Sequence, residues 1–154
     1  MSMNILERPA AAVTAVAPQK ILVINDSPDF LTFMREFLTL EGGYEVATLD
    51  QSEGVIEQVT AKPPHLIILD IVFRSGPTGY EVAETLAAAA ETTGIPVLFC
   101  TALSERDVAE EIRERVHAGE QRILYKPFDV DVLLRIVGEM LGNQQEADVL
   151  VSAN

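Results

Sequence analysis

Five side chains with useful chemistry stand at or just after the ends of short apolar runs. Asn25 and Asp26 follow the first run, Asp70 ends the third, Thr101 follows the fourth, and Lys126 follows the fifth. Two ionised carboxylates held close together repel each other, and a divalent cation such as Mg2+ relieves that repulsion. A carboxylate can then act as the nucleophile and form an acyl phosphate, while an ammonium group and a hydroxyl stabilise the transferred charge. This set of residue types indicates phosphoryl transfer.

Each residue taken singly also has a structural explanation. Asp26 could cap a turn, Thr101 could cap the entry to a helix, and Lys126 could be solvated. The joint placement at four strand ends is what favours a site.

Apolar runs alternate along the chain with segments of helical periodicity, which predicts five strands and five helices. The runs are continuous, as expected of strands covered on both faces, so the fold class is α/β with a doubly wound parallel sheet. Ligand sites in such sheets lie beyond the carboxyl ends of the strands. The expected strands are 20–24, 44–48, 66–70, 96–100 and 122–125, and the expected helices are 28–41, 51–61, 78–91, 104–117 and 129–141.

Length and composition indicate one domain. The 154 residues are 48% hydrophobic and 23% charged, which suits a globular chain. We expect a flexible N-terminal leader over 1–19, a domain over 20–142 and a polar tail over 143–154. The net charge of -13 disfavours nucleic-acid binding, and no apolar run is long enough for a membrane span. A cytoplasmic protein is expected, with Cys100 as a small buried residue.

Five motifs, in this order and spacing, resemble the response-regulator receiver domain of two-component signalling, a CheY-like single domain. The resemblance covers about residues 19 to 142. The motifs are Lys20–Asp26 (KILVIND), Leu66–Asp70 (LIILD), Gly79–Val82 (GYEV), Thr101-Ala102 and Lys126–Phe128 (KPF).

The resemblance implies a flavodoxin-like fold with strand order 2-1-3-4-5, and a cis peptide bond between Lys126 and Pro127. It also implies a role for each site residue. Those roles are phospho-acceptor for Asp70, Mg2+ ligands for Asp26 and Asp70, a metal-binding backbone carbonyl for Val72, the switch hydroxyl for Thr101, and phosphoryl binding for Lys126.

Several positions depart from the family pattern. Asn25 replaces one of two adjacent acids, so it would act on the metal only indirectly and weakly, and weaker Mg2+ binding is expected. The loop after Asp70 is one residue longer than usual. Ile123 stands where the family often has an aromatic residue, which puts the usual switch in doubt. Val72 and Leu103 are apolar, so we expect slow self-dephosphorylation.

The leading functional hypothesis is a receiver that takes a phosphoryl group from a sensor histidine kinase or phosphotransfer protein. It would then signal by binding a downstream protein through the fourth helix, fifth strand and fifth helix, a face that also allows homodimers. The alternative is a pseudo-receiver that acts as a non-phosphorylated interaction module. An aspartyl hydrolase would need an acid two residues after Asp70, where Val72 stands, so we do not expect an enzyme.

Overall fold

The computed structural model describes residues 17–110, 112 and 121–142 of the 154-residue chain. Five strands form one parallel sheet in the order β2-β1-β3-β4-β5, which confirms the predicted order. The elements in chain order are β1 (Lys20–Ile24), α2 (Pro28–Gly42), β2 (Glu45–Leu49), α3 (Val55–Ala61), β3 (Leu66–Leu69), α4 (Gly79–Ala88), β4 (Val97–Thr101), the 3₁₀ turn η1 (Glu105–Asp107), β5 (Gln121–Tyr125) and α6 (Val130–Met140).

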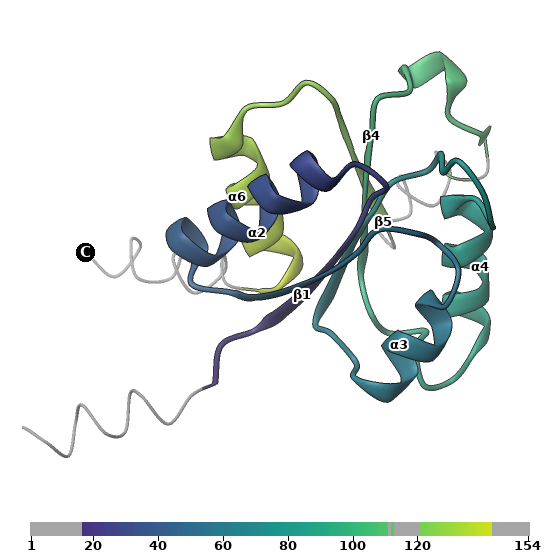
Figure 1. Cartoon of the computed structure of the whole chain (residues 1–154), viewed down its shortest axis with the longest axis horizontal. Coiled ribbons are helices and arrows are strands. Elements are labelled where there is room, and N and C mark those ends of the chain that lie inside the picture. The colour runs from purple at the N-terminus through teal and green to yellow at the C-terminus, as the bar shows by residue number, and fades with distance from the viewer. Residues whose placement is uncertain (1–16, 111, 113–120, 143–154) are drawn as a thin grey trace, which may run out of the picture.

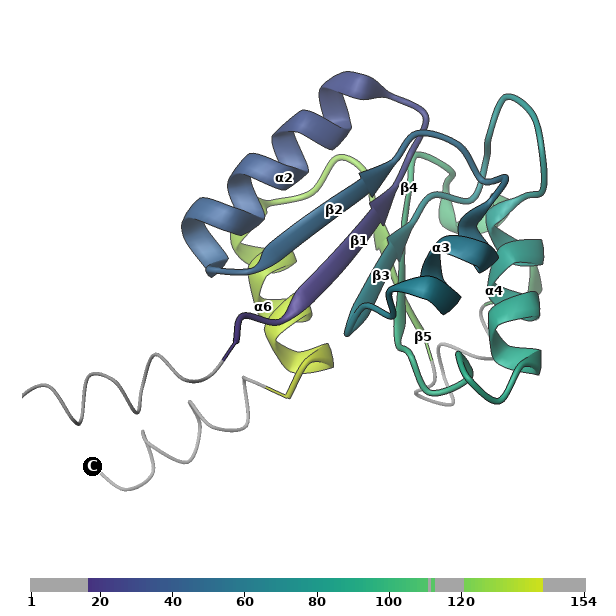
Figure 2. The same ribbon diagram turned by 60° about the horizontal axis from the view of Figure 1, so that its bottom comes forward.

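Helices cover both faces of the sheet. Helices α2 and α6 lie on one face, while α3 and α4 lie on the other (Figure 1, Figure 2). The predicted doubly wound α/β architecture is therefore confirmed. Among the described residues, no helix has the length and apolar character needed to cross a membrane.

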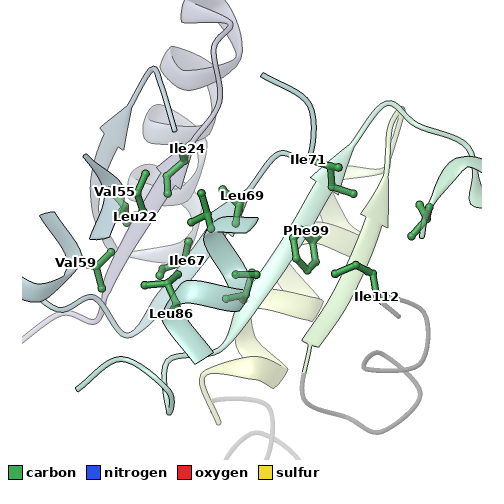
Figure 3. Close-up of a cluster of buried hydrophobic side chains, with 14 residues drawn as sticks. Leu22, Ile24, Val55, Val59, Ile67, Leu69, Ile71, Leu86, Phe99 and Ile112 are labelled. Atoms are coloured by element: carbon green, nitrogen blue, oxygen red, sulfur yellow. The ribbon is translucent and has the colours of Figure 1, made fainter. Parts of the chain in front are cut away.

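The hydrophobic core has two parts, one on each face of the sheet. The part beneath α3 and α4 includes Leu22, Ile67 and Phe99, which point from the strands toward the helices (Figure 3). The other part, beneath α2 and α6, includes Cys100. Burial raises the pKa of the Cys100 thiol to about 12, so this residue is a buried apolar group, as the sequence indicates.

The ends of two helices follow the signals in the sequence. Ser27 caps α2 by accepting the Phe30 N–H, and Gly43 ends it in a left-handed conformation. Thr78 and Glu81 form a reciprocal capping box at the start of α4.

Helix α3 differs from its prediction. It begins at Val55, not at 51, because Gly54 adopts a φ of 81° that a continuing helix does not allow. The expected capping pair of Asp50 and Glu53 is therefore wrong.

Two other predictions are only partly testable. Of the helix expected over 104–117, the structure shows the 3₁₀ turn η1 at Glu105–Asp107 and helical backbone at Glu110 and Ile112, while residues 111 and 113–117 lie outside the described residues. The expected tail, and residues 1–16 of the expected leader, also lie outside them. Helix α4 ends at Ala88, three residues before the expected end at 91.

Gly79 lets the start of α4 pack against the end of β3. Its N–H donates to the Ile71 carbonyl at 2.8 Å. A Cβ at this position would lie 2.1 Å from the Asp70 carbonyl oxygen and 2.8 Å from the Ile71 Cα. Because both neighbours are backbone atoms, a side chain at position 79 would displace the segment that carries Asp70.

We expect Gly79→Ala to lower the free energy of unfolding by about 3 kcal/mol or more, as for a severe overpacking substitution. The control is Gly138→Ala in α6, where an added Cβ meets nothing within 4 Å. That change should be neutral or stabilising by up to about 1 kcal/mol, since alanine favours helix. Urea unfolding measures both. Equal stability of the two variants would contradict the close approach at Gly79.

Candidate functional site

The register of the sheet brings the predicted residues to one edge. Ile24 pairs with Leu69, so Asn25 and Asp70, the next residues along their strands, lie beside each other. Thr101 pairs with Tyr125 at the ends of β4 and β5. The Lys126 N–H then donates to the Thr101 carbonyl at 2.8 Å.

Asp70 is the centre of this edge. Its Oδ2 accepts a hydrogen bond from Asn25 Nδ2 at 3.0 Å and lies 3.9 Å from Lys126 Nζ. Its Oδ1 accepts the Ile71 N–H at 2.7 Å. Only 13% of the Asp70 side chain is exposed.

Burial raises the pKa of the Asp70 carboxyl above its ordinary value, because the buried site disfavours the ionised form. The Ile71 N–H, the Lys126 charge and the Val72 N–H lower this pKa, and the nearby Asp26 raises it. The desolvation effect exceeds the stabilisation that these donors supply. Asp70 is thus a carboxylate whose negative charge the protein compensates only in part.

Asn25 contacts the Asp70 carboxylate directly. Its side chain is buried, and its Oδ1 accepts the Ser27 N–H at 2.8 Å. That bond fixes the orientation of the amide and turns its NH2 group toward Asp70. Sequence reasoning considered the negative charge that Asn25 removes, but it missed the hydrogen-bond donor that the amide adds.

The Lys126 ammonium group contacts both the Asp70 carboxylate and the Phe30 ring. Its Nζ lies 4.0 Å from the centroid of the Phe30 ring, within the range of a cation–π interaction. Phe30 in turn packs edge-on against Phe128, with ring centroids 6.5 Å apart. The Lys126-Pro127 peptide bond is cis, as the resemblance implied. The sequence gives no sign of this contact between Phe30 and the lysine.

Thr101 lies at the same edge but faces the following loop. It is buried, and its Oγ1 accepts the Leu103 N–H at 3.1 Å. Further along this loop, the Ala109 N–H donates to the hydroxyl of Tyr80 at 3.0 Å. The Tyr80 ring also packs near Phe99, so Tyr80 links α4 both to β4 and to the loop that Thr101 begins.

Asp26 lies on the other side of the site, near the loop that follows Asp70. Its Oδ2 accepts the Arg74 N–H at 3.1 Å and lies 3.8 Å from Arg74 Nε. Val72 in this loop is 55% exposed, and Ile123 packs against the core.

The oxygen donors at this edge fit Mg2+. Within the described ranges, no cluster of three or more His, Cys, Asp or Glu side chains could hold a metal. Mg2+ is commonly held by only one or two carboxylates, with water and phosphate oxygens completing its shell. Asp26, Asp70 and a backbone carbonyl supply hard oxygen donors of that kind.

The chain matches the model of the response regulator receiver domain over residues 21–138. PilH of Pseudomonas aeruginosa is 27% identical over 123 residues, which cover 79% of this chain and 97% of PilH. Rre1, a response regulator of Synechocystis, is 28% identical over 128 residues, or 83% of this chain and 54% of Rre1. The chain spans only 29% to 58% of the length of several such relatives.

A solved structure shares the fold. The receiver domain of the sensor histidine kinase PA1611 from Pseudomonas aeruginosa, with magnesium in its active-site cleft, is 24% identical with a TM-score of 0.67. The likeness covers 82% of this chain and 99% of that one. The family match over most of the described chain, together with the parallel sheet and the edge built around Asp70, shows that this chain belongs to the response regulator receiver domains of two-component signalling.

Proposed function

We propose that this receiver accepts a phosphoryl group on Asp70 and passes the signal on by phosphorylation-dependent protein binding. The observation that carries the proposal is the position of the Asp70 carboxylate. It is partly buried at the end of β3, with Lys126 Nζ 3.9 Å from Oδ2. An anionic group transferred to this oxygen would arrive beside a fixed positive charge.

The chain's own residues supply most of the chemistry. An Asp70 oxygen attacks the phosphorus of the donor, the new O–P bond forms, and the P–N bond of a phosphohistidine breaks with its electron pair on the imidazole. Lys126 stabilises the negative charge on the transferred group, and the Thr101 hydroxyl can turn to donate to it. The raised pKa of Asp70 shows that the metal-free site stabilises this carboxylate only in part.

Mg2+ would be held by Asp26, Asp70 and the backbone carbonyl of Val72, with Asn25 acting only indirectly. The metal supplies positive charge that offsets the two carboxylates and the phosphoryl oxygens. Its presence in the cleft of the related PA1611 receiver supports the same role here.

The proposed partners follow from the family. A sensor histidine kinase or a phosphotransfer protein donates the phosphoryl group, and a downstream protein reads the phosphorylated form. The face that includes β5 and α6 is the proposed output surface, and it would also serve in a homodimer. We place this exchange in the cytoplasm. The domain is a signalling module and performs no turnover beyond its own phosphorylation and dephosphorylation.

A second candidate is a pseudo-receiver that binds its partner without phosphorylation. The contact between Asn25 Nδ2 and Asp70 Oδ2 favours it, because a donated hydrogen bond stabilises Asp70 in the absence of metal. Ile123 favours it as well, since an aliphatic residue cannot make the usual aromatic switch.

Phosphorylation of Asp70 separates the two candidates. Incubation with a small acyl phosphate and Mg2+ should add one phosphoryl group to the intact protein, seen by mass spectrometry. Asp70→Asn should abolish the addition. Asp131→Asn, the same substitution at an exposed position of α6, should leave it unchanged. An unmodified wild-type protein would favour the pseudo-receiver.

The phosphorylated form should persist for minutes or longer. Val72 and Leu103 offer an attacking water no side-chain hydrogen bond, and Val72 is exposed enough to accept a polar replacement. Val72→Asn should therefore shorten the lifetime several-fold, as followed by loss of the phosphoryl mass after the donor is removed. A wild-type lifetime of seconds would contradict this account.

Asn25→Asp should destabilise the metal-free protein at neutral pH by about 1–3 kcal/mol, because a buried donor facing Asp70 becomes a second carboxylate. The added negative charge raises the Asp70 pKa further. As the pH falls, the pair binds a proton and the repulsion ends, so the deficit should shrink. Mg2+ should also reduce it.

Urea unfolding at several pH values, with and without Mg2+, measures this deficit. Gln58→Glu, which also adds one negative charge but lies in α3 near Lys20 at the start of β1, serves as the control. A deficit in Asn25→Asp that grows toward acid pH would contradict the proposed repulsion.

A further inference from the structure

The loop between β3 and α4 is fixed at both its base and its middle. At the base, the Gly79 N–H donates to the Ile71 carbonyl at 2.8 Å. In the middle, the Arg74 N–H donates to Asp26 Oδ2 at 3.1 Å. Gly76, with a φ of 83°, allows the chain to turn back toward α4. The backbone of Arg74 is therefore held against the carboxylate proposed to bind the metal.

The side chain of Arg74 approaches the same oxygen. Its Nε lies 3.8 Å from Asp26 Oδ2, and 84% of the Arg74 side chain is exposed, compared with 26% of the Asp26 side chain. The guanidinium group thus lies on the solvent side of Asp26. A cation entering from solvent to reach Asp26 meets this positive charge.

The positive and negative side chains of the site are equal in number. Asp26 faces Arg74, and Asp70 faces Lys126, so two carboxylates are matched by two cationic side chains. Asn25 adds no charge. A divalent ion that binds here has to displace or tolerate one of these cations, and Arg74 is the more exposed of the two.

We propose that Arg74 is a counter-ion of Asp26 that competes with Mg2+ and weakens metal binding at the site. The inference rests on the proposed function, since it assigns Mg2+ to Asp26. The backbone hydrogen bond from Arg74 to Asp26 places the arginine beside the carboxylate that is proposed to bind the metal. The guanidinium group moves aside when Mg2+ binds. Because the side chain is exposed, this movement costs little free energy.

The expected size of the effect is modest. An ion pair this exposed adds little to stability, because water screens it. A divalent cation, however, experiences twice the Coulomb repulsion of a single charge at the same distance. Removing the arginine charge should therefore tighten Mg2+ binding by about two- to fivefold at low ionic strength.

The experiment is an NMR titration of the full chain with MgCl2 at constant ionic strength, following backbone amides near Asp70. Arg74→Gln should bind Mg2+ about two- to fivefold more tightly than wild type. Arg74→Lys, which keeps the charge, should stay close to wild type. The spectra themselves report whether each variant is folded.

The matched control is Arg122→Gln. Arg122 is also paired with a carboxylate, Glu139, at 2.6 Å, but it lies near the start of β5, at the opposite end of the sheet. This variant changes the net charge equally and should keep the wild-type affinity. Equal tightening in both glutamine variants would overturn the proposal, because net charge alone would explain it.

Two further outcomes are distinguishable. If wild type and Arg74→Gln bind Mg2+ with the same affinity, the role of Arg74 is overturned and the proposed function stands. If neither binds Mg2+ at millimolar concentration, the metal assignment in the proposed function is overturned together with this inference.

Discussion

The partial burial of one carboxylate at the end of β3 is the constraint on which the site depends. An ionised Asp70 is expensive to remove from water, and the protein offsets that cost with the Asn25 amide, the Ile71 N–H and the Lys126 charge. The compensation is partial, because burial still raises the Asp70 pKa. A group transferred to Asp70 that brings its own contacts to Lys126, together with a metal ion, would complete it.

The fold supplies this compensation through the register of its strands. Parallel pairing places the residues after β1, β3 and β5 at one edge, so groups distant in sequence meet without any long loop. Gly79 keeps α4 close behind Asp70, and Phe30 on α2 positions Lys126 from the other face of the sheet. Elements of both helical layers therefore contribute to one site.

The sequence predicts the strands well, because continuous apolar runs carry a strong signal, and the resemblance to the receiver family supplies their order. The sequence-based prediction fails where the backbone conformation of a single residue determines where a helix begins. Gly54 starts α3 four residues later than the side-chain capping pattern suggests. Four site residues could be found from the sequence, because carboxylate, hydroxyl and ammonium groups at strand ends indicate phosphoryl transfer. They are Asp26, Asp70, Thr101 and Lys126. The roles proposed for Arg74 and Phe30 could not be found in this way, since a loop arginine and a helical phenylalanine have many ordinary uses. The donor role of Asn25 also required coordinates, because only the Ser27 contact shows which way the amide faces.

In the metal-free protein the negative charge of Asp70 is only partly compensated. A pH titration of the metal-free protein in which NMR follows the side-chain carboxyl carbon of Asp70 measures this compensation. We expect a pKa above the ordinary value of 3.8 for this group, and a lower pKa once Mg2+ is added. A metal-free pKa at or below 3.8 would show instead that Asn25, Ile71 and Lys126 fully stabilise the ionised carboxylate.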